Sequence, residues 1–144
     1  MTEEDRGLVE LDMDLQHRRI GHVAAVTKVL YSTYLTQGPA VPAFEQAVAA
    51  KVNATWGVAV NSATSALHIA CLALGLGTGD WLWTVPNTFV ATANCAIYCG
   101  AKVDFVDIDE STSLISINEL KKKIEIAKKF NKLPKILIPV HLSG

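Results

Sequence analysis

Short apolar runs alternate with segments of helical spacing over residues 57 to 140. Each run has the length and composition of a buried strand, and the segments between runs repeat apolar residues at helical intervals. Strands that alternate with helices predict a parallel sheet, because parallel neighbours need a long crossover connection. Runs that are apolar throughout fit this sheet, since helices would cover both of its faces. We therefore predict an α/β fold with a mostly parallel sheet and flanking helices.

Capping residues and glycines indicate where these elements should begin and end. Ser116 followed by Glu119 has the pattern of a capping box at a helix start. Gly75 and Gly100 stand where two helices should stop. The predicted strands are 57–60, 80–85, 102–106 and 136–140. The predicted helices are 17–31, one with Pro42 in its first turn, 62–74, 88–98 and 116–130, with a loop over 31–41.

We expect an atypical acidic tail over 1–16, helices and a loop over 17–56, and a partial α/β domain over 57–144. Half of the 144 residues are hydrophobic, which suffices for a globular core. Thirteen basic and fourteen acidic residues give a net charge of −1, which argues against nucleic acid or an anionic membrane as a partner. The polar start is unlike a secretory signal, and the longest apolar stretch, 63–76, is too short to span a bilayer. A cytoplasmic protein is expected.

Three cysteines, Cys71, Cys95 and Cys99, are an odd and small number, which does not suggest a disulfide framework. Cys95 and Cys99 are four residues apart on a predicted helix and should share a face. We expect small buried side chains here rather than metal ligands, because no second ligand pair lies near in sequence.

The segment Asn61 to Ser65 is a candidate anion site, because it follows a predicted strand and opens a predicted helix. Free backbone N–H groups and the helix dipole favour an anion at such a position. Ala63 is small enough to let a phosphate approach the main chain, and Thr64 adds a hydroxyl donor. Plain helix capping by Ser62 or Thr64 explains the same residues equally well. The glycine spacing of a P-loop or a dinucleotide fingerprint is absent.

Three further candidates follow predicted strands. Phe89, within Pro86–Thr92, could stack on a flat aromatic ligand, although a phenylalanine at a helix start is more often a core residue. His141 could hydrogen-bond a cofactor or substrate, and a structural role is the simpler interpretation. A solvated turn is favoured over a catalytic pair for the acidic residues Asp104, Asp107 and Asp109.

Six motifs stand in the order and spacing of one enzyme family. Together they resemble the DegT/DnrJ/StrS family of nucleotide-sugar aminotransferases, which depend on pyridoxal 5'-phosphate (PLP), from about residue 18 to the end. The likeness is greatest to the PseC branch, which makes UDP-4-amino-4,6-dideoxy-N-acetyl-β-L-altrosamine on the way to pseudaminic acid. The family's usual start is not seen in 1–16. The motifs are Leu35–Val41, Phe44-Glu45, Asn61–Leu67, Pro86–Asn94, Val106–Asp109 and Pro139–Gly144.

The resemblance implies the large domain of a fold-type-I aminotransferase, working as a homodimer with sites at the subunit interface. It implies that Ala63 and Thr64 hold the cofactor phosphate and that Phe89 stacks on the pyridine ring. It also implies that His141 lies near that ring. It further implies that a sugar or cofactor site, in this subunit or in its partner, is lined by Thr33, Tyr34, Leu35 and Thr36.

The resemblance also shows what residues 1–144 lack. PLP chemistry needs a Schiff-base lysine and a carboxylate beside the pyridine nitrogen, and in the family both follow the segment that Pro139–Gly144 resembles. We expect the full-length protein to transfer an amino group, from glutamate, to the 4-keto group of a UDP-linked 4-keto-6-deoxy sugar. We expect this chain alone to be inactive and to expose apolar surface. A non-catalytic phosphate- or nucleotide-binding α/β module and the non-functional product of a truncated gene remain alternatives.

Overall fold

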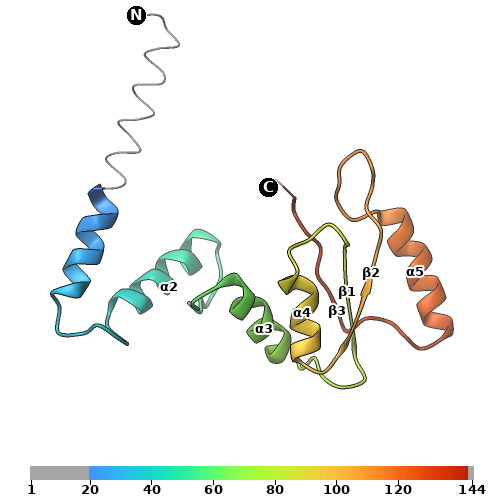
Figure 1. Ribbon diagram of the computed structural model, residues 1–144, viewed down its shortest axis with the longest axis horizontal. Coiled ribbons are helices and arrows are strands. Elements are labelled where there is room, and N and C mark those ends of the chain that lie inside the picture. Colours follow the sequence, from blue (N-terminus) through green and yellow to red (C-terminus); the bar gives the residue numbers. More distant parts are fainter. Residues whose placement is uncertain (1–19, 143–144) are drawn as a thin grey trace, which may run out of the picture. The chain divides into compact units, whose positions relative to one another are not determined.

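The computed structural model describes residues 20–142, which divide into two compact units at Ala59 and Val60 (Figure 1). In the first unit, residues 20–30 are helical, and a turn leads to helix α2, Ala40–Lys51. Helix α2 begins two residues before Pro42, which lies in its first turn as predicted. The predicted tail over 1–16 and the first residues of the helix predicted from residue 17 lie outside the described residues.

The second unit confirms the predicted α/β class. Its three strands form one parallel sheet in the order β2-β1-β3, with β1 in the centre. Leu82 of β1 stands opposite Val103 of β2 and Ile136 of β3. The elements are α3 (Ala63–Ala73), β1 (Trp81–Thr84), α4 (Ala91–Tyr98), β2 (Lys102–Phe105), α5 (Ile117–Lys129) and β3 (Ile136–Leu137).

The strand predicted over 57–60 is wrong, because that segment is extended without belonging to a sheet. Gly57 and Ala59 instead contact helix α2 of the same unit. The N–H of Ala59 donates to Glu45 Oε1 at 2.8 Å. A Cβ added at Gly57 would stand 2.7 Å from the Glu45 carbonyl oxygen, so only glycine fits this approach. The apolar pattern predicted a strand, but a strand forms only where a neighbouring strand accepts its hydrogen bonds.

Two further limits differ from the predicted ones by more than one residue. The last strand covers Ile136–Leu137 rather than 136–140. Its pairing continues for one residue, because the Ile138 N–H donates to the Trp83 carbonyl at 2.9 Å and Thr84 Oγ1 donates to the Ile138 carbonyl at 2.9 Å. Pro86 then follows in the central chain and has no N–H with which to extend the ladder. Helix α4 begins at Ala91 rather than at residue 88.

The sheet separates two apolar clusters, because successive side chains of a strand point to opposite faces. Leu82 packs on the α3 and α4 side with Cys71, Cys95 and Ala96. The other face holds the cluster that helix α5 covers, and Figure 1 shows α5 across the sheet from α4. This second cluster contains Trp81, Trp83, Val106, Ile115, Leu120, Ile124 and Ala127. Helices on both faces explain why β1 carries large apolar side chains on both sides of the sheet.

Each of the helices α2 to α5 ends in a Schellman motif, with a left-handed residue just past its C-cap. In α4 the Ala101 N–H donates to the Ala96 carbonyl at 2.9 Å, and the Gly100 N–H donates to the Ile97 carbonyl at 2.9 Å. Gly100 has φ 72°, and Ala96 and Ala101 share one apolar cluster. The predicted stops at Gly75 and Gly100 are therefore confirmed. The left-handed residues are Asn53, Gly75, Gly100 and Asn131.

Gly100→Ala should lower the free energy of unfolding by about 1–2 kcal/mol, the cost of a left-handed conformation for a residue with a Cβ. The added Cβ would also stand 3.1 Å from Thr78 Oγ1. Gly77→Ala is the matched control, because no atom lies within 4 Å of its added Cβ and its φ is ordinary. Urea unfolding followed by circular dichroism measures both variants. Equal losses would show that the left-handed position is not the cause.

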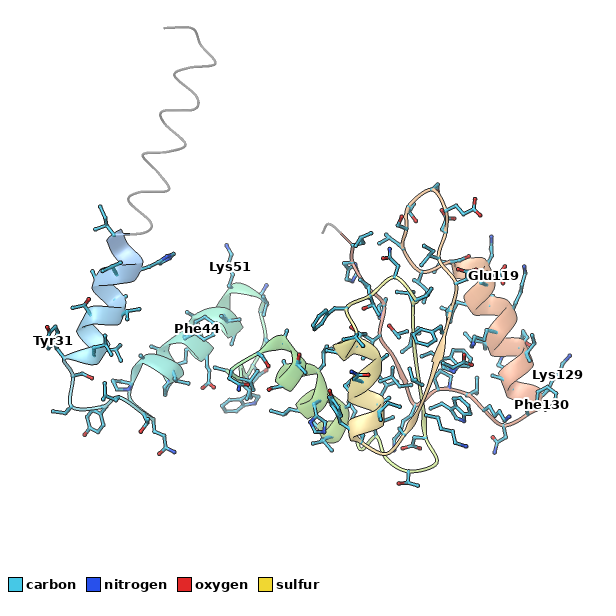
Figure 2. The ribbon with its side chains drawn as sticks, in the orientation of Figure 1. Tyr31, Phe44, Lys51, Glu119, Lys129 and Phe130 are labelled. Carbon is cyan, nitrogen blue, oxygen red and sulfur yellow. The ribbon has the colours of Figure 1, made fainter. Side chains whose placement is uncertain are left out.

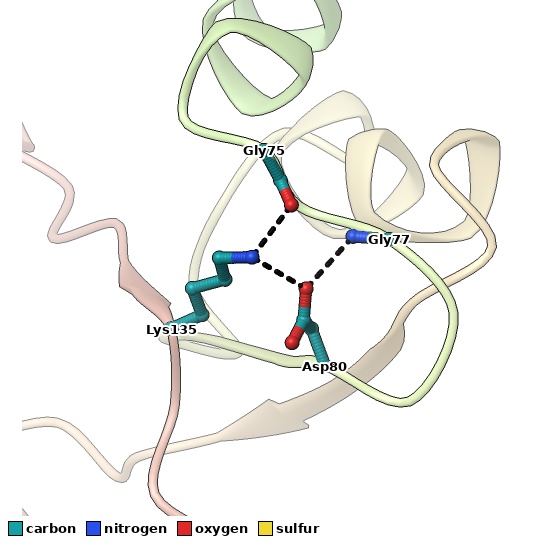
Figure 3. A network of polar contacts seen from close by, with 4 residues as sticks. All are labelled: Gly75, Gly77, Asp80 and Lys135. Carbon is teal, nitrogen blue, oxygen red and sulfur yellow. Dashed lines mark hydrogen bonds and ion pairs between the residues drawn. The ribbon is translucent and has the colours of Figure 1, made fainter.

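An ion pair ties the entry into β1 to the entry into β3 (Figure 3). Lys135 Nζ donates to the Gly75 carbonyl at 2.6 Å and to Asp80 Oδ2 at 3.0 Å. The Gly77 N–H donates to the same carboxylate oxygen at 3.0 Å. The hydrogen bond from Lys135, followed by the one from Gly77, lowers the pKa of Asp80 from its ordinary value of 3.8.

The lowered pKa of Asp80 should make stability fall in acid. A carboxyl whose pKa is lower in the folded state stabilises that state above its unfolded value, here 3.8, and loses the contribution as the pH falls through the folded value. In Lys135→Met the loss of stability between pH 7 and pH 3 should be smaller than in the unchanged chain. Urea midpoints at both pH values measure it. Lys129→Met, on the exposed end of α5, is the control that should keep the full pH dependence.

The expected exposure of apolar side chains is confirmed in both units. Tyr31, Phe44 and Phe130 are 89%, 61% and 67% exposed, and Figure 2 shows Tyr31 and Phe130 at helix ends and Phe44 on α2. On the strands, Phe105 is also partly exposed. Within the described residues, no helix has both the length and the apolar composition needed to cross a bilayer. Surface of this kind should make the chain prone to association.

Candidate functional site

The first turn of α3 combines a side-chain cap with free backbone donors. Ser62 is extended, and its Oγ accepts the Ser65 N–H at 3.2 Å, which confirms capping by Ser62 rather than by Thr64. Ser65 Oγ donates in turn to Asn61 Oδ1 at 2.7 Å. Within residues 20–142, no hydrogen bond uses the N–H groups of Ala63 and Thr64. The cap and a bound anion are therefore compatible, because they use different donors.

The charge distribution of α3 favours an anion at the same place. Its first turn holds no acidic residue and its last turn no basic residue, so no side chain in either turn offsets the helix dipole. Ala63 is exposed and Thr64 is half-buried. A phosphate at this end would thus meet backbone donors, a nearby hydroxyl and the positive end of the dipole.

Helices α3 and α4 pack against each other through small side chains. Cys71 Sγ lies 3.5 Å from Cys95 Sγ, and the rings of His68 and Tyr98 meet edge to face with centroids 5.4 Å apart. Burial raises the pKa of the Cys71 thiol to about 12, so this cysteine is a small apolar residue and no nucleophile. Cys95 and Cys99 face the same apolar cluster, as their spacing predicted.

The two helices end side by side at the edge of the sheet where the strands begin. Gly100, just after α4, lies against Thr78 in the turn that leads from α3 into β1. Both helices therefore run toward this edge, and their starts point away from it (Figure 1). The N-terminus of α3 is thus on the side of the unit to which the carboxyl ends of the strands point, where ligands bind in open α/β sheets.

The carboxyl ends of β1 and β3 bring Phe89 and His141 to one edge of the sheet. Phe89 is 71% exposed, so its interpretation as a core residue is wrong. The reason is that α4 starts only at Ala91, whose side chain with that of Thr92 is buried in place of the ring. Thr88 Oγ1 donates to Thr92 Oγ1 at 2.9 Å and holds the loop in place. His141 is exposed as well.

The alternating acidic residues serve local structure. Asp104 lies on β2 and pairs with Lys123 of α5 at 2.7 Å, so it is not part of a turn. Asp109 heads the expected turn, accepting hydrogen bonds from the Ser111 hydroxyl and from the amides of Ser111 and Thr112. These bonds, that of the Ser111 hydroxyl first, lower the pKa of Asp109. Asp104 and Asp109 thus have separate partners, which favours local structural roles for them over a catalytic pair.

The loop predicted to line a sugar or cofactor site lies in the first unit. Thr33, Tyr34, Leu35 and Thr36 are all exposed. Tyr34 and Leu35, with Lys28 and Gln37, line a pocket of about 350 Å³. A Cβ added at Gly38 would stand 2.8 Å from Tyr34 Cβ, so glycine lets the loop close on itself at this point. Thr33 and Thr36 do not line that pocket.

The site residues are therefore brought together only in part. Phe89 and His141 share the carboxyl edge, and the start of α3 faces that side. Among the described residues, no hydrogen bond joins segment 61–65 to Phe89 or His141. The Thr88–Thr92 hydroxyl pair was not predicted, although a threonine before and within a helix start is a recognisable capping signal.

Comparison with known proteins accounts for this arrangement. The family model "DegT/DnrJ/EryC1/StrS aminotransferase family" matches residues 18–144. The chain belongs to this aminotransferase family. The spore coat polysaccharide biosynthesis protein SpsC of Bacillus subtilis (strain 168) is 42% identical over 122 residues, which are 85% of this chain and 30% of SpsC. The chain thus spans about a third of the length of this family member.

Two solved structures have a similar fold. A DegT DnrJ EryC1 StrS aminotransferase from Brucella abortus is 30% identical with a TM-score of 0.80, over 91% of this chain and 36% of that one. NtdA from Bacillus subtilis, with bound cofactor PMP, is 31% identical with a TM-score of 0.73, over 85% of this chain and 27% of that one. The described fold is therefore part of a fold-type-I domain of this family.

Proposed function

We propose that this chain is the front part of a PLP-dependent aminotransferase subunit of sugar metabolism. The reaction is transfer of an amino group, from glutamate, to the 4-keto group of a UDP-linked 4-keto-6-deoxy sugar in the cytoplasm. Membership of the aminotransferase family supports it, as do the polysaccharide pathway in the name of SpsC and the PMP cofactor in that of NtdA. Assignment to the PseC branch and to pseudaminic acid rests on the motif resemblance alone.

The observation that carries this proposal is the pair of unused backbone N–H groups at Ala63 and Thr64. They lie at the start of α3, whose first turn contains no acidic residue. These amides and the Thr64 hydroxyl would hold the cofactor phosphate. The exposed ring of Phe89 would cover the pyridine ring, and His141 would contact it from the neighbouring strand end. The bound cofactor would supply an electron sink beside the substrate amine. Thr33, Tyr34, Leu35 and Thr36 would contact the sugar, across the interface of a homodimer.

Residues 1–144 alone should bind the cofactor weakly and perform no transamination. The chemistry needs a lysine that forms a covalent bond with the cofactor and moves the proton, and no lysine of this chain matches the family's position. Addition of PLP followed by borohydride tests this. We expect no stable labelling concentrated at a single lysine. One specifically labelled lysine would contradict the inactivity of this chain.

Chemical shift changes in the ¹⁵N-labelled chain test the proposed cofactor contacts. Added PLP should shift the amides of Ala63 and Thr64 together with resonances of Phe89. Pyridoxal without its phosphate should shift none of them at the same concentration. Shifts caused equally well by UDP or inorganic phosphate, without any change at Phe89, would instead support a phosphate- or nucleotide-binding module. No shift at Ala63 and Thr64 with any of these would remove the basis of the proposal.

A further inference from the structure

A second pocket lies on the face of the sheet that α5 covers, between β1 and the end of that helix. Its volume is about 330 Å³, at the lower end of the range of small-molecule sites. It lies among side chains of β1, β2, α5 and the turn after α5, apart from the carboxyl edge that holds Phe89 and His141. This tryptophan pocket is lined by Trp81, Trp83, Asp104, Lys123, Ile126, Ala127, Phe130 and Lys132.

Aromatic rings and lysines together make up its walls. Trp81 and Trp83 are two apart on β1 and therefore face the same side of the sheet. Lys123 Nζ lies 5.2 Å from the centroid of the Trp83 ring, and Lys132 Nζ lies 6.0 Å from that of the Trp81 ring. Lys102, opposite Trp81 in the register of β2, adds a third ammonium at 5.4 Å from the same ring. Flat apolar surface and positive charge are thus combined in one place.

The lysines differ in what they already bind. Lys123 donates to Asp104 Oδ2 at 2.7 Å and to the Phe105 carbonyl at 2.7 Å, so its charge is compensated. Lys132 forms no ion pair within residues 20–142 and keeps its donors available. The charges that line the pocket, two lysines and Asp104, therefore sum to one positive charge. That excess favours an anion over a neutral or cationic ligand.

A buried donor without an acceptor provides a second, independent observation. Trp83 is 2% exposed, and its Nε1 is the buried side-chain polar atom for which residues 20–142 offer no hydrogen-bond partner. Buried indole N–H groups nearly always have an acceptor. A ligand that carries an acceptor and opens the pocket slightly would satisfy this donor. The alternating tryptophans of β1 are the sequence signal for this pocket, although their apolar pattern by itself predicts only a strand.

We propose that the tryptophan pocket binds a small aromatic carboxylate. The ring of the ligand packs among Trp81, Phe130 and Ile126, and its carboxylate pairs with Lys132. The site is independent of the proposed cofactor site, because none of its lining residues belongs to α3 or to the carboxyl edge. Its ligand would therefore act as an effector or a second substrate group and would not compete with PLP.

The indole N–H resonances of the ¹⁵N-labelled chain test the proposal directly, with 2-naphthoate as the probe. Saturable shifts of the Trp81 and Trp83 indole signals are expected, while Trp56, in the first unit, stays unchanged as an internal control. The neutral analogue 2-naphthamide should bind about tenfold more weakly, because it loses the charge-assisted bond. Equal affinity for both probes would overturn the proposal.

Variants separate the pocket from general adsorption to apolar surface. Lys132→Met keeps the aliphatic stem and should weaken 2-naphthoate binding about tenfold. Lys129→Met removes a charge from the exposed end of α5, three residues before Lys132, and should leave the affinity unchanged (Figure 2). Both positions are exposed, so the fold is not at risk. Equal effects of the two variants, or shifts at Trp56 as large as those at Trp83, would show that no specific site exists.

Discussion

Leu82→Ala should lower the free energy of unfolding by about 2–5 kcal/mol, the range for a leucine deleted from a packed core. Leu82 is 0% exposed at the centre of the central strand. Its side chain contacts the cluster that joins the sheet to α3 and α4, which includes Cys71, Cys95 and Ile136. The alanine would leave a cavity where helices and sheet meet, and rigid neighbours on both sides would prevent its collapse. Urea unfolding followed by far-ultraviolet circular dichroism measures the loss.

Leu74→Ala makes the same chemical change at a position that is 63% exposed. Its effect should stay within about 0.5 kcal/mol, as is usual for surface substitutions. The difference between the two variants isolates burial from the intrinsic preference of alanine. If both variants lost the same stability, the apolar cluster around Leu82 would not be the core that holds the second unit together.

Ala63→Asp should weaken PLP binding about tenfold to hundredfold and at the same time leave the helix intact or slightly more stable. The new carboxylate would lie in the first turn of α3, close to the proposed phosphate position, where two negative charges repel strongly. The same carboxylate interacts favourably with the helix dipole, which is worth about 0.3–1 kcal/mol. Opposite signs for binding and stability would exclude misfolding as the cause. Titration calorimetry with PLP and thermal unfolding measure the two effects.

Ala70→Asp is the control for Ala63→Asp, because it adds the same charge at an exposed position two turns further along α3. It should leave PLP affinity within about a factor of two, since at this distance water and salt screen the charge. Comparable losses from both variants would mean that general charge, rather than the start of α3, controls binding. Inorganic phosphate as a second ligand shows whether the effect resides in the phosphate group.

Local signals predicted most of the second unit correctly. The capping pattern at Ser116 is confirmed, with Ser116 Oγ accepting the Glu119 N–H at 3.3 Å. The reciprocal bond of a full capping box is not formed, because the Ser116 N–H donates to the Asp107 carbonyl instead. Gly75 and Gly100 predicted two helix ends, because the left-handed backbone conformation that follows a helix favours glycine. In α5 the same role falls to Asn131, which the pattern did not single out.

The candidate site was predictable where chemistry depends on a few consecutive residues, as in the first turn of α3. The parts of the site in which solvent exposure decides the role of a side chain could not be predicted. Phe89 is exposed because α4 begins at Ala91, and that start depends on how the loop after β1 is bonded through Thr88 and Thr92. Lys135 and Asp80 meet across 55 positions of the chain, a contact that no local pattern contains.

The order of strands and helices from Ala63 onward, the helix ends at Gly75 and Gly100 and the family resemblance follow from the sequence by itself, because propensity, capping and apolar periodicity act over a few neighbouring residues. The tertiary structure alone decided which segments share a sheet and which side chains remain accessible. Residues 57–60 have the composition of a strand but belong to no sheet, and Gly57 and Ala59 contact Glu45 of α2, since no neighbouring strand is there to accept their hydrogen bonds. Pairing, burial and pockets are properties of distant segments in contact, and free energy is gained only when those segments meet.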